Sequence, residues 1–366
     1  MFSERVKSID ISGIRKMFEG AGPNAINLGL GQPDFDTPEH IKKAAIEAIN
    51  SGFTGYTANL GIPELRLALC GKFEQENNFT VAPDEVIVTS GASEALHLAL
   101  AALIDRGDDV LIPDPGFVSY SALTKMAGGS VVGVPLGDKL TLEPEKVNEC
   151  ITPRTKVLII NSPSNPTGTV QTKKDIKGLA QIAEDTGITI ISDEVYEHFI
   201  YEGEHVSPAQ FTDNVITINA VSKTYAMTGW RIGYAAARKE YIEQMLKVHQ
   251  YIQACACSIA QKAALAAIEG PQDCVRDMCA SFKRRRDILL EGLRAMGIKC
   301  VKPQGAFYAF PQVVDENAPQ KLIKNGVIVV PGASFGENGK GHIRLAYSTS
   351  EENLRKALGV MERVLI

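Results

Sequence analysis

The sequence predicts an α/β protein, with a large domain built on a mostly parallel sheet covered by helices and a smaller α+β domain. Short, nearly continuous apolar runs rich in β-branched residues alternate with stretches of helical spacing from residue 86 to residue 238. A long helical stretch follows at residues 273–296, and strand-like runs in a different pattern come after it. The length of 366 residues is enough for one large and one smaller domain.

The strands expected in the large domain come in a regular succession. In chain order, they are residues 86–89, 110–113, 131–134, 157–160, 188–192, 215–219 and 232–236. Helices are expected between strands of this series, at residues 92–103, 118–126 and 173–184. Strands that are apolar at nearly every position indicate a sheet covered on both faces. We expect the functional site at the carboxyl ends of these strands.

The small domain is expected after the long helix. Strand-like runs at residues 300–301, 306–310, 326–330 and 342–347 predict a second sheet with helices between its strands. Near the N-terminus, residues 29–34 form a turn-rich segment that periodicity alone does not assign to either domain.

Composition and charge exclude several classes of protein. The formal net charge of −5 gives no electrostatic footprint for nucleic acid, and the basic run at residues 283–286 indicates a solvated or salt-bridged helix face. Seven cysteines without a CxxC pair indicate a reducing compartment. The polar N-terminus and the lack of any run of ~18 apolar residues predict neither a signal peptide nor a membrane helix. We therefore expect a soluble, cytoplasmic protein that binds neither nucleic acid nor membrane.

The strongest chemical signal lies at residues 219–234. Lys223 comes just after a strand-like run, beside hydroxyl residues, and Arg231 follows eight positions later. Burial and nearby cations can lower a lysine pKa to roughly 7–8, which suits an amine that reacts with a cofactor aldehyde. Ser222 and Arg231 are suitable donors for a phosphate group. A lone lysine after a strand is usually a surface residue, so this hypothesis depends on the rest of the sequence.

The thirteen residues from Ser222 to Tyr234, Ser-Lys-Thr-Tyr-Ala-Met-Thr-Gly-Trp-Arg-Ile-Gly-Tyr, resemble the Schiff-base motif of class I/II aminotransferases. These are fold-type I pyridoxal-phosphate-dependent enzymes, and the similarity to their aspartate/aromatic group extends over nearly the whole chain. The resemblance implies pyridoxal 5'-phosphate as the cofactor, held as a Schiff base on Lys223. It also implies a large cofactor-binding domain at residues 46–270 and a small domain made of residues 1–45 and 271–366.

Three further residues resemble the family's contacts to the cofactor ring. Asn165, in an Asn-Pro-Thr-Gly turn, matches the asparagine whose amide binds the ring hydroxyl, and its bond to Pro166 is expected to be cis. Asp193 matches the carboxylate that keeps the ring nitrogen protonated, and Tyr196 matches the tyrosine that binds the ring oxygen opposite Asn165. The resemblance thus implies Lys223, Asp193 and Tyr196 as catalytic residues.

A metal site is the alternative for the segment around Asp193. Asp193, Glu194 and His198 are potential ligands, but their spacing fits no strong ligand pattern. We expect no metal here, with Glu194 and His198 as helix-start and surface residues.

Gly91, Ala92 and Ser93 lie between a strand-like run and a helical one, where backbone N–H groups favour anions. Within the family resemblance, these three residues hold the cofactor phosphate. Phe117 matches the position whose ring stacks on the pyridine, although many relatives have a larger aromatic residue there. Tyr56 matches a tyrosine that reaches the phosphate of the neighbouring subunit, which implies a homodimer with shared active sites.

Four residues are implied as substrate contacts. Gly31 resembles a family position that meets the substrate carboxylate through its backbone, and Asn165 is implied as a second substrate contact. Arg344 matches the arginine that grips the α-carboxylate, and its planar fork suits bidentate recognition. Ile14 is expected to line the pocket and would favour apolar or mixed side chains.

The resemblance implies a ping-pong transamination in which an L-amino acid, aspartate or glutamate being favoured, gives its amino group to a 2-oxo acid, 2-oxoglutarate being expected. Lys223 acts in it as both base and acid. Aromatic or broad specificity stays open.

Other functions are weaker alternatives. A carbon–sulfur β-lyase or an aminocyclopropanecarboxylate-synthase-like enzyme would share the implied residues, because reaction type depends on how substrate bonds align with the ring. A nicotinamide-dependent dehydrogenase is disfavoured because residues 29–31 lack the third glycine of the dinucleotide motif. A regulator that has borrowed the fold would carry an additional DNA-binding domain, which we do not expect ahead of this one.

Overall fold

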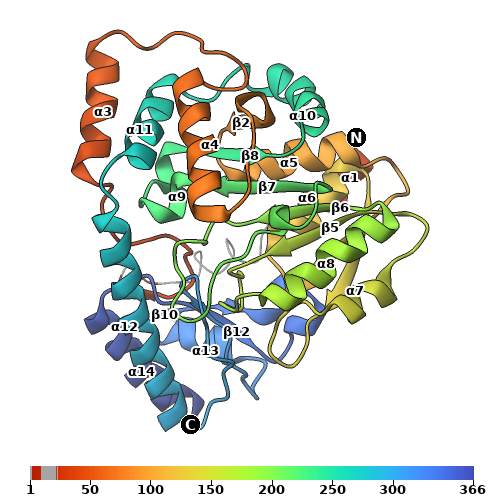
Figure 1. Cartoon of the computed structure of the whole chain (residues 1–366). Coiled ribbons are helices and arrows are strands. Elements are labelled where there is room, and N and C mark those ends of the chain that lie inside the picture. The colour runs from red at the N-terminus through yellow and green to blue at the C-terminus, as the bar shows by residue number, and fades with distance from the viewer. Residues whose placement is uncertain (1, 10–21, 23) are drawn as a thin grey trace.

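A seven-stranded sheet forms the centre of the larger part of the molecule in the computed structural model, which describes residues 2–9, 22 and 24–366 (Figure 1). Its strand order is β2-β8-β7-β6-β5-β3-β4. The strands are β2 (Val86–Thr89), β3 (Asp109–Asp114), β4 (Ser130–Pro135), β5 (Thr155–Asn161), β6 (Thr189–Asp193), β7 (Val215–Ala220) and β8 (Gly233–Ala236). Only β8 pairs with its neighbours in the antiparallel sense, so the mostly parallel sheet predicted from the sequence is confirmed.

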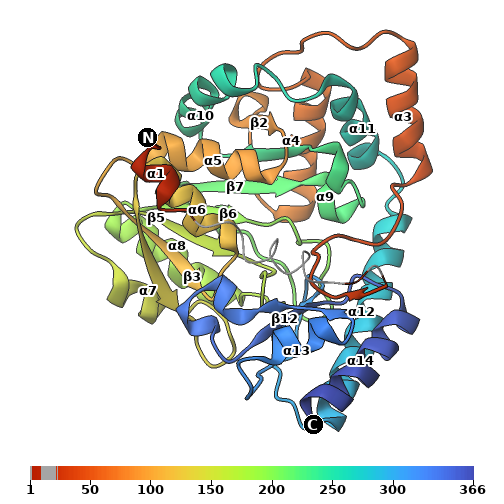
Figure 2. The ribbon, with the colours of Figure 1, turned by 180° about the vertical axis from the view of Figure 1, so that it is seen from behind.

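Both faces of this sheet are apolar and covered by helices (Figures 1 and 2). In β5, Val157 and Ile159 pack into the core on one face, whereas Leu158 and Ile160 pack on the other. One face carries α5 (Ala92–Leu103), α6 (Val118–Ala127) and α10 (Lys239–Ile252). The other carries α3 (Glu39–Asn50), α4 (Pro63–Asn77), α7 (Pro144–Cys150), α8 (Lys173–Thr186) and α11 (Ser258–Glu269). Covering both faces explains why the strands are apolar at nearly every position.

Two smaller sheets lie below the large one in Figure 1. The strands β11 (Val330–Pro331), β12 (Ile343–Ala346) and β9 (Tyr308–Ala309) form one antiparallel sheet, and β1 (Ile26–Asn27) pairs in parallel with β10 (Val327–Ile328). The helices α12 (Asp273–Ala295), α13 (Ala318–Lys324) and α14 (Glu351–Leu365) pack beside them. The β1–β10 pair therefore joins the turn-rich N-terminal segment to the last third of the chain.

The remaining elements are short. They are α1 (Glu4–Lys7), α9 (Val221–Thr224) and the 3₁₀ turns Pro83–Glu85, Pro208–Gln210, Thr228–Trp230, Gly332–Phe335 and Glu337–Gly339. Among the helices that the described residues form, none combines the length and the apolar composition that crossing a membrane requires.

One expectation about the last third of the chain is wrong, and another is confirmed in one of its two forms. The pair Cys300-Val301 is not in a strand; the backbone between α12 and β9 is irregular and includes Pro303, which has no N–H for a ladder. In the basic run, Arg285 and Arg286 are buried rather than solvated, and each forms an ion pair, so the salt-bridged alternative is confirmed. They lie on the side of α12 that faces the rest of the protein, where Arg285 contacts Asp34 and Arg286 contacts Glu202.

Candidate active site

A cavity of about 250 Å³ lies where the carboxyl ends of β5, β6 and β7 face the smaller sheets. Most of the residues selected from the sequence line it: Gly31, Ala92, Ser93, Phe117, Asn165, Asp193, Tyr196, Ser222, Lys223, Arg231 and Arg344. They come from the ends of separate strands, from the start of α5, from the N-terminal segment and from β12. The fold thus brings together positions that are more than 300 residues apart in the chain.

Lys223 lies in the short helix α9, directly after β7, and its amine points into the cavity. Removal of the amine from bulk water lowers its pKa to about 8, with help from the positive charges of Arg231 and Arg344, while Asp193 opposes the change. The Nζ atom donates a hydrogen bond of 2.8 Å to the backbone oxygen of Gly31. An appreciable fraction of this amine is therefore unprotonated near neutral pH and able to act as a nucleophile.

We expect the acylation rate of Lys223 in the cofactor-free protein to reach half its maximum near pH 8, since only the unprotonated amine reacts. Exposed lysines as a class would reach theirs near pH ~10.4. Brief labelling with acetic anhydride across pH 6–11, followed by peptide mass spectrometry, measures both midpoints in one sample. A midpoint for Lys223 that coincides with that of the exposed lysines would contradict the low pKa.

Asp193 ends β6 and is almost wholly buried. Burial raises its pKa to about 6, although the hydroxyl of Tyr120 donates a hydrogen bond of 2.7 Å to Oδ2 and lowers it in part. The carboxylate is thus mostly charged at neutral pH, held in place, and able to pair with a cationic ring nitrogen. Tyr120 was not selected from the sequence, because a tyrosine inside an amphipathic helix carries no local sign of a site.

Arg344 is the most unusual charge in the cavity. Its guanidinium lies between the rings of Tyr308 and Phe335, 4.8 and 5.0 Å from their centroids. It donates to Asn165 Oδ1 at 3.1 Å and to the backbone oxygen of Gly29, but within the described residues no carboxylate pairs with it and Nε has no partner. A buried cation without a counter-ion is costly, so this position favours binding an anion.

Tyr196 and Tyr308 form a pair of hydroxyls at the same end of the cavity. Their oxygens lie 2.7 Å apart and their rings meet edge to face. Tyr308 also explains the glycine at position 31, because a Cβ there would lie 2.1 Å from the Tyr308 hydroxyl. Tyr308 was missed from the sequence because it reaches the site only through the pairing of β9 with β12.

The other end of the cavity has the features of an anion site. The helix α5 begins at Ala92, after Gly91 with φ of 88°. Arg231 donates to the backbone oxygens of Thr228 at 2.8 Å and Ser90 at 3.4 Å, and a Cβ on Gly91 would lie 2.3 Å from its Nη2. The start of a twelve-residue helix beside an arginine that no carboxylate of the described residues neutralises suits a phosphate group.

Three selected residues do not line the cavity, and one of them, Gly91, directly precedes Ala92 at the start of α5. Tyr56 is 91% exposed and lies outside the cavity, which leaves its contact to a neighbouring subunit as a prediction. Ile14 lies outside the described residues. The cis bond expected between Asn165 and Pro166 is present. Leu30, Leu96, Asn161, Val195 and Ala220 also line the cavity, but their side chains carried no chemical signal in the sequence.

The expectation that Glu194 is a surface residue is wrong. Glu194 is fully buried, and the hydroxyls of Ser192 and Ser207 donate to its Oε1 at 2.9 and 2.7 Å. His205 Nε2 lies 2.8 Å from Oε2. These partners explain how a charged side chain next to Asp193 is accommodated away from water.

Comparison with known proteins relates the fold and the cavity to one family. Residues 23–361 match the family model described as aminotransferase class I and II. The "probable aspartate aminotransferase" of Methanocaldococcus jannaschii is 51% identical over the full length of both chains. The "aromatic-amino-acid aminotransferase 2" of Thermococcus litoralis is 40% identical, covering 99% of this chain and 98% of that one. The solved aspartate aminotransferase of Thermus thermophilus, with maleate, has a TM-score of 0.95 and 43% identity, with both chains fully covered.

Proposed function

Because this chain belongs to the class I and II aminotransferase family, we propose that it binds pyridoxal 5'-phosphate on Lys223 and moves the amino group of an L-amino acid to a 2-oxo acid. The observation that carries the proposal is the charge arrangement of one cavity. It holds an amine with a pKa of about 8, a buried carboxylate and a buried arginine without a counter-ion. These three groups match an aldehyde, a ring nitrogen and an α-carboxylate respectively.

The remaining cofactor-binding roles are assigned to residues at the phosphate end of the cavity and to residues around the ring. Gly91, Ala92, Ser93, Ser222 and Arg231 would hold the phosphate at the start of α5. At the ring, Phe117 would stack, Asp193 would hold the nitrogen proton, and Asn165 and Tyr196 would bind the ring oxygen.

The chemistry follows from how the residues hold protons. When bound, pyridoxal phosphate supplies a protonated ring that draws electrons away from the substrate's α-carbon. Lys223, once released, has a pKa low enough to take the α-proton and to return it later. Arg344, with the backbone at Gly31, would fix the α-carboxylate and so aim the α-proton at Nζ.

Aspartate or glutamate with 2-oxoglutarate is the favoured substrate pair, and several relatives are named aspartate aminotransferases. A specific observation supports an aromatic donor as the second candidate. Lys223, Arg231 and Arg344 are the cations that line the cavity within the described residues, and each already has a role. Leu30, Phe117 and Tyr308 would meet an apolar side chain instead, so a second carboxylate would need a cation from outside this set.

We also propose a cytoplasmic homodimer with shared sites and with the domain boundaries given above. The support is a group of large side chains left in water by this chain, with Tyr56 91% and Tyr251 87% exposed. Cys255 Sγ lies 3.5 Å from the backbone N of Thr57, next to Tyr56, so both exposed tyrosines belong to one region of the surface. A second copy covering this region would bring Tyr56 to the phosphate end of its partner's cavity.

The proposed function is tested by the visible absorption of the purified protein with pyridoxal phosphate, before and after single amino acids are added. We expect the band of the lysine-bound cofactor to bleach with aspartate or glutamate and to return with 2-oxoglutarate. Bleaching by phenylalanine or tyrosine instead would assign the aromatic candidate. Release of pyruvate and ammonia without an acceptor would indicate a lyase, and no band at all would refute the proposal.

Replacing Asp193 with asparagine should reduce turnover of the loaded enzyme by about 10²–10³-fold, because the ring nitrogen loses its charged partner. The same change should stabilise the cofactor-free protein. Burial raises the pKa of Asp193 to about 6 from 3.8, so the ionised form costs stability above pH 6 and nothing below pH 3.8. The gain should be about 1–3 kcal/mol at pH 8 and should vanish near pH 4. Urea denaturation at both pH values measures it.

A further inference from the structure

The turn that follows β6 presents its side chains to two different surroundings. Asp193 and Tyr196 line the cavity. Glu194 and Glu197 instead enter a buried polar cluster at the end of α4. The turn is short and internally bonded, since the Glu197 N–H donates to the Glu194 oxygen at 2.9 Å. A shift of the carboxylates on one side would therefore move the cavity residues on the other.

Glu197 is the centre of this cluster. Its Oε1 accepts hydrogen bonds from Lys72 Nζ and from Asn219 Nδ2, the latter at 2.6 Å, and its Oε2 accepts one from Asn77 Nδ2 at 2.6 Å. Burial by itself would raise the pKa of this carboxyl, but the nearby cations, first among them Lys72, hold it at about 2. The carboxylate is thus charged and fully bonded at neutral pH, in a place where a loss of partners is expensive.

The contact to Asn219 reaches the strand that leads to the reactive lysine. Asn219 is in β7, four residues before Lys223. Backbone bonding between β6 and β7 ends where the Glu194 N–H donates to the Ile218 oxygen at 2.9 Å. Beyond this point the two chain segments separate, and side chains must set their relative position.

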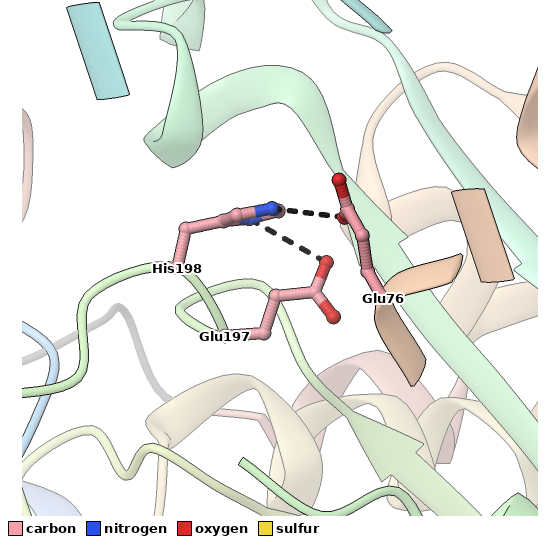
Figure 3. A group of neighbouring side chains, drawn as sticks. All are labelled: Glu76, Glu197 and His198. Atoms are coloured by element: carbon pink, nitrogen blue, oxygen red, sulfur yellow. Dashed lines mark hydrogen bonds and ion pairs between the residues drawn. The ribbon is translucent and has the colours of Figure 1, made fainter. Parts of the chain in front are cut away.

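A second link runs parallel to the first. His198 Nδ1 lies 3.1 Å from the hydroxyl of Thr224, the residue next to Lys223. Its Nε2 lies 3.1 Å from Glu76 Oε2, and Figure 3 shows the ring nitrogens facing the carboxylates of Glu76 and Glu197. Two side-chain contacts, Glu197–Asn219 and His198–Thr224, therefore connect the segment that carries Asp193 to the segment that carries Lys223. Neither contact involves a residue that lines the cavity.

We propose that Glu197 is a positioning residue, which sets the turn bearing Asp193 and Tyr196 at a fixed distance from the segment bearing Lys223. The proposal rests on the proposed function, because these are the groups that would hold the ring nitrogen and the aldehyde carbon of one rigid cofactor. A ring bound at two points tolerates little change in the separation of those points. Positioning of this kind affects rate steeply, since displacement by ~1 Å can cost about 10²-fold.

The same cluster does not need a metal ion to be stable. Glu76, Glu197 and His198 offer ligand atoms within 4.8 Å of one another. Lys72 Nζ, however, contacts Glu197 and lies 3.7 Å from Glu76 Oε2, so an ammonium group already supplies the positive charge. A cation at this place would have to displace it.

The test uses Glu197→Gln, which keeps the size of the side chain but replaces one acceptor oxygen with a donor. The new NH₂ group would face donors on Lys72, Asn77 or Asn219, so the hydrogen bonds that hold the two segments together should weaken. Glu74→Gln is the matched control, because it makes the same chemical change at an exposed position of α4, two residues from Lys72, and leaves the Glu197–Asn219 and His198–Glu76 contacts intact. Asn219→Ala removes that bond while keeping the Glu197–Lys72 pair, and reports the same effect if Glu197→Gln fails to fold.

Three quantities are measured with pyridoxal phosphate as the probe: its dissociation constant, the pH midpoint of the visible absorption of the bound cofactor, and kcat with KM. For Glu197→Gln we expect kcat to fall about 10- to 100-fold with KM nearly unchanged. The pH midpoint should move by about half a unit or more, a threefold change in proton affinity. Asn219→Ala should shift both in the same direction, and Glu74→Gln should match the wild type.

The outcomes separate the inference from the proposed function. A folded Glu197→Gln variant that loses thermal stability, yet keeps the wild-type pH midpoint and kcat, would show a purely structural residue and overturn the positioning role. Equal shifts in Glu74→Gln would also overturn it, since they would reflect lost charge and not the lost link to β7. If the wild-type protein gives no visible band with pyridoxal phosphate, the proposed function itself fails, whatever the variants do.

Discussion

Replacing Lys223 with alanine is expected to lower the transamination rate by about 10⁴-fold or more, because one amine serves as the covalent anchor, the base and the acid. No other lysine lines the cavity among the described residues, so no neighbour can substitute for it. Pyridoxal phosphate should still bind to the variant, since Arg231, the start of α5 and Asp193 are unchanged. The loss should therefore appear in the chemistry rather than in the fold.

The measurement is reduction with borohydride followed by peptide mass spectrometry, together with the visible spectrum. In the wild type, the cofactor should be fixed on the peptide that contains Lys223, and in Lys223→Ala it should be fixed nowhere. Lys223→Arg keeps the positive charge without a reactive amine and should be as inactive as the alanine variant. Lys146→Ala, in α7 and outside the cavity, is the control and should behave as the wild type. A labelled peptide elsewhere in Lys223→Ala would disprove the assignment.

The sheet could be predicted from the sequence because its physical cause is local. A strand covered on both faces has a continuous apolar run, as Val157–Ile160 shows, and helical spacing between such strands leaves few topologies. The strand predicted at residues 300–301 is wrong because two apolar residues in succession are too few to distinguish a strand from a loop packed on a core. Their burial comes from the elements around them, which no local pattern reveals.

The residues of the site also fall into two groups, those with a signal in the sequence and those without one. Lys223 and Asp193 could be found because each lies at or just after an apolar strand-like run, within a segment whose resemblance to the family gave it a role. Tyr120 and Tyr308 could not, because each reaches the cavity through tertiary packing of its helix or strand. Glu197 was missed for a related reason, since its function would lie in contacts with α4 and β7, far from it in the chain.

Replacing Arg344 with lysine should lower kcat/KM for the amino-acid donor by about 30- to 5000-fold, the range that corresponds to ~2–5 kcal/mol for truncating one partner of a buried charge pair. Lysine keeps the charge, but it cannot form two parallel bonds to a carboxylate, nor lie flat between the rings of Tyr308 and Phe335. Asn165 would lose a donor as well. The defect should be dominated by KM, because the carboxylate is held before and during the reaction.

Cofactor binding separates this effect from general damage. Arg344 lies at the opposite end of the cavity from Arg231 and α5, so the dissociation constant of pyridoxal phosphate should change by less than about threefold if each arginine serves a different anion. An amine that lacks a carboxylate should react equally slowly with wild type and variant, because it cannot use the arginine in either. Arg284→Lys, on the exposed side of α12, provides the matched control. If Arg344→Lys weakened the cofactor and the substrate alike, Arg344 would be holding the cavity together rather than recognising the α-carboxylate.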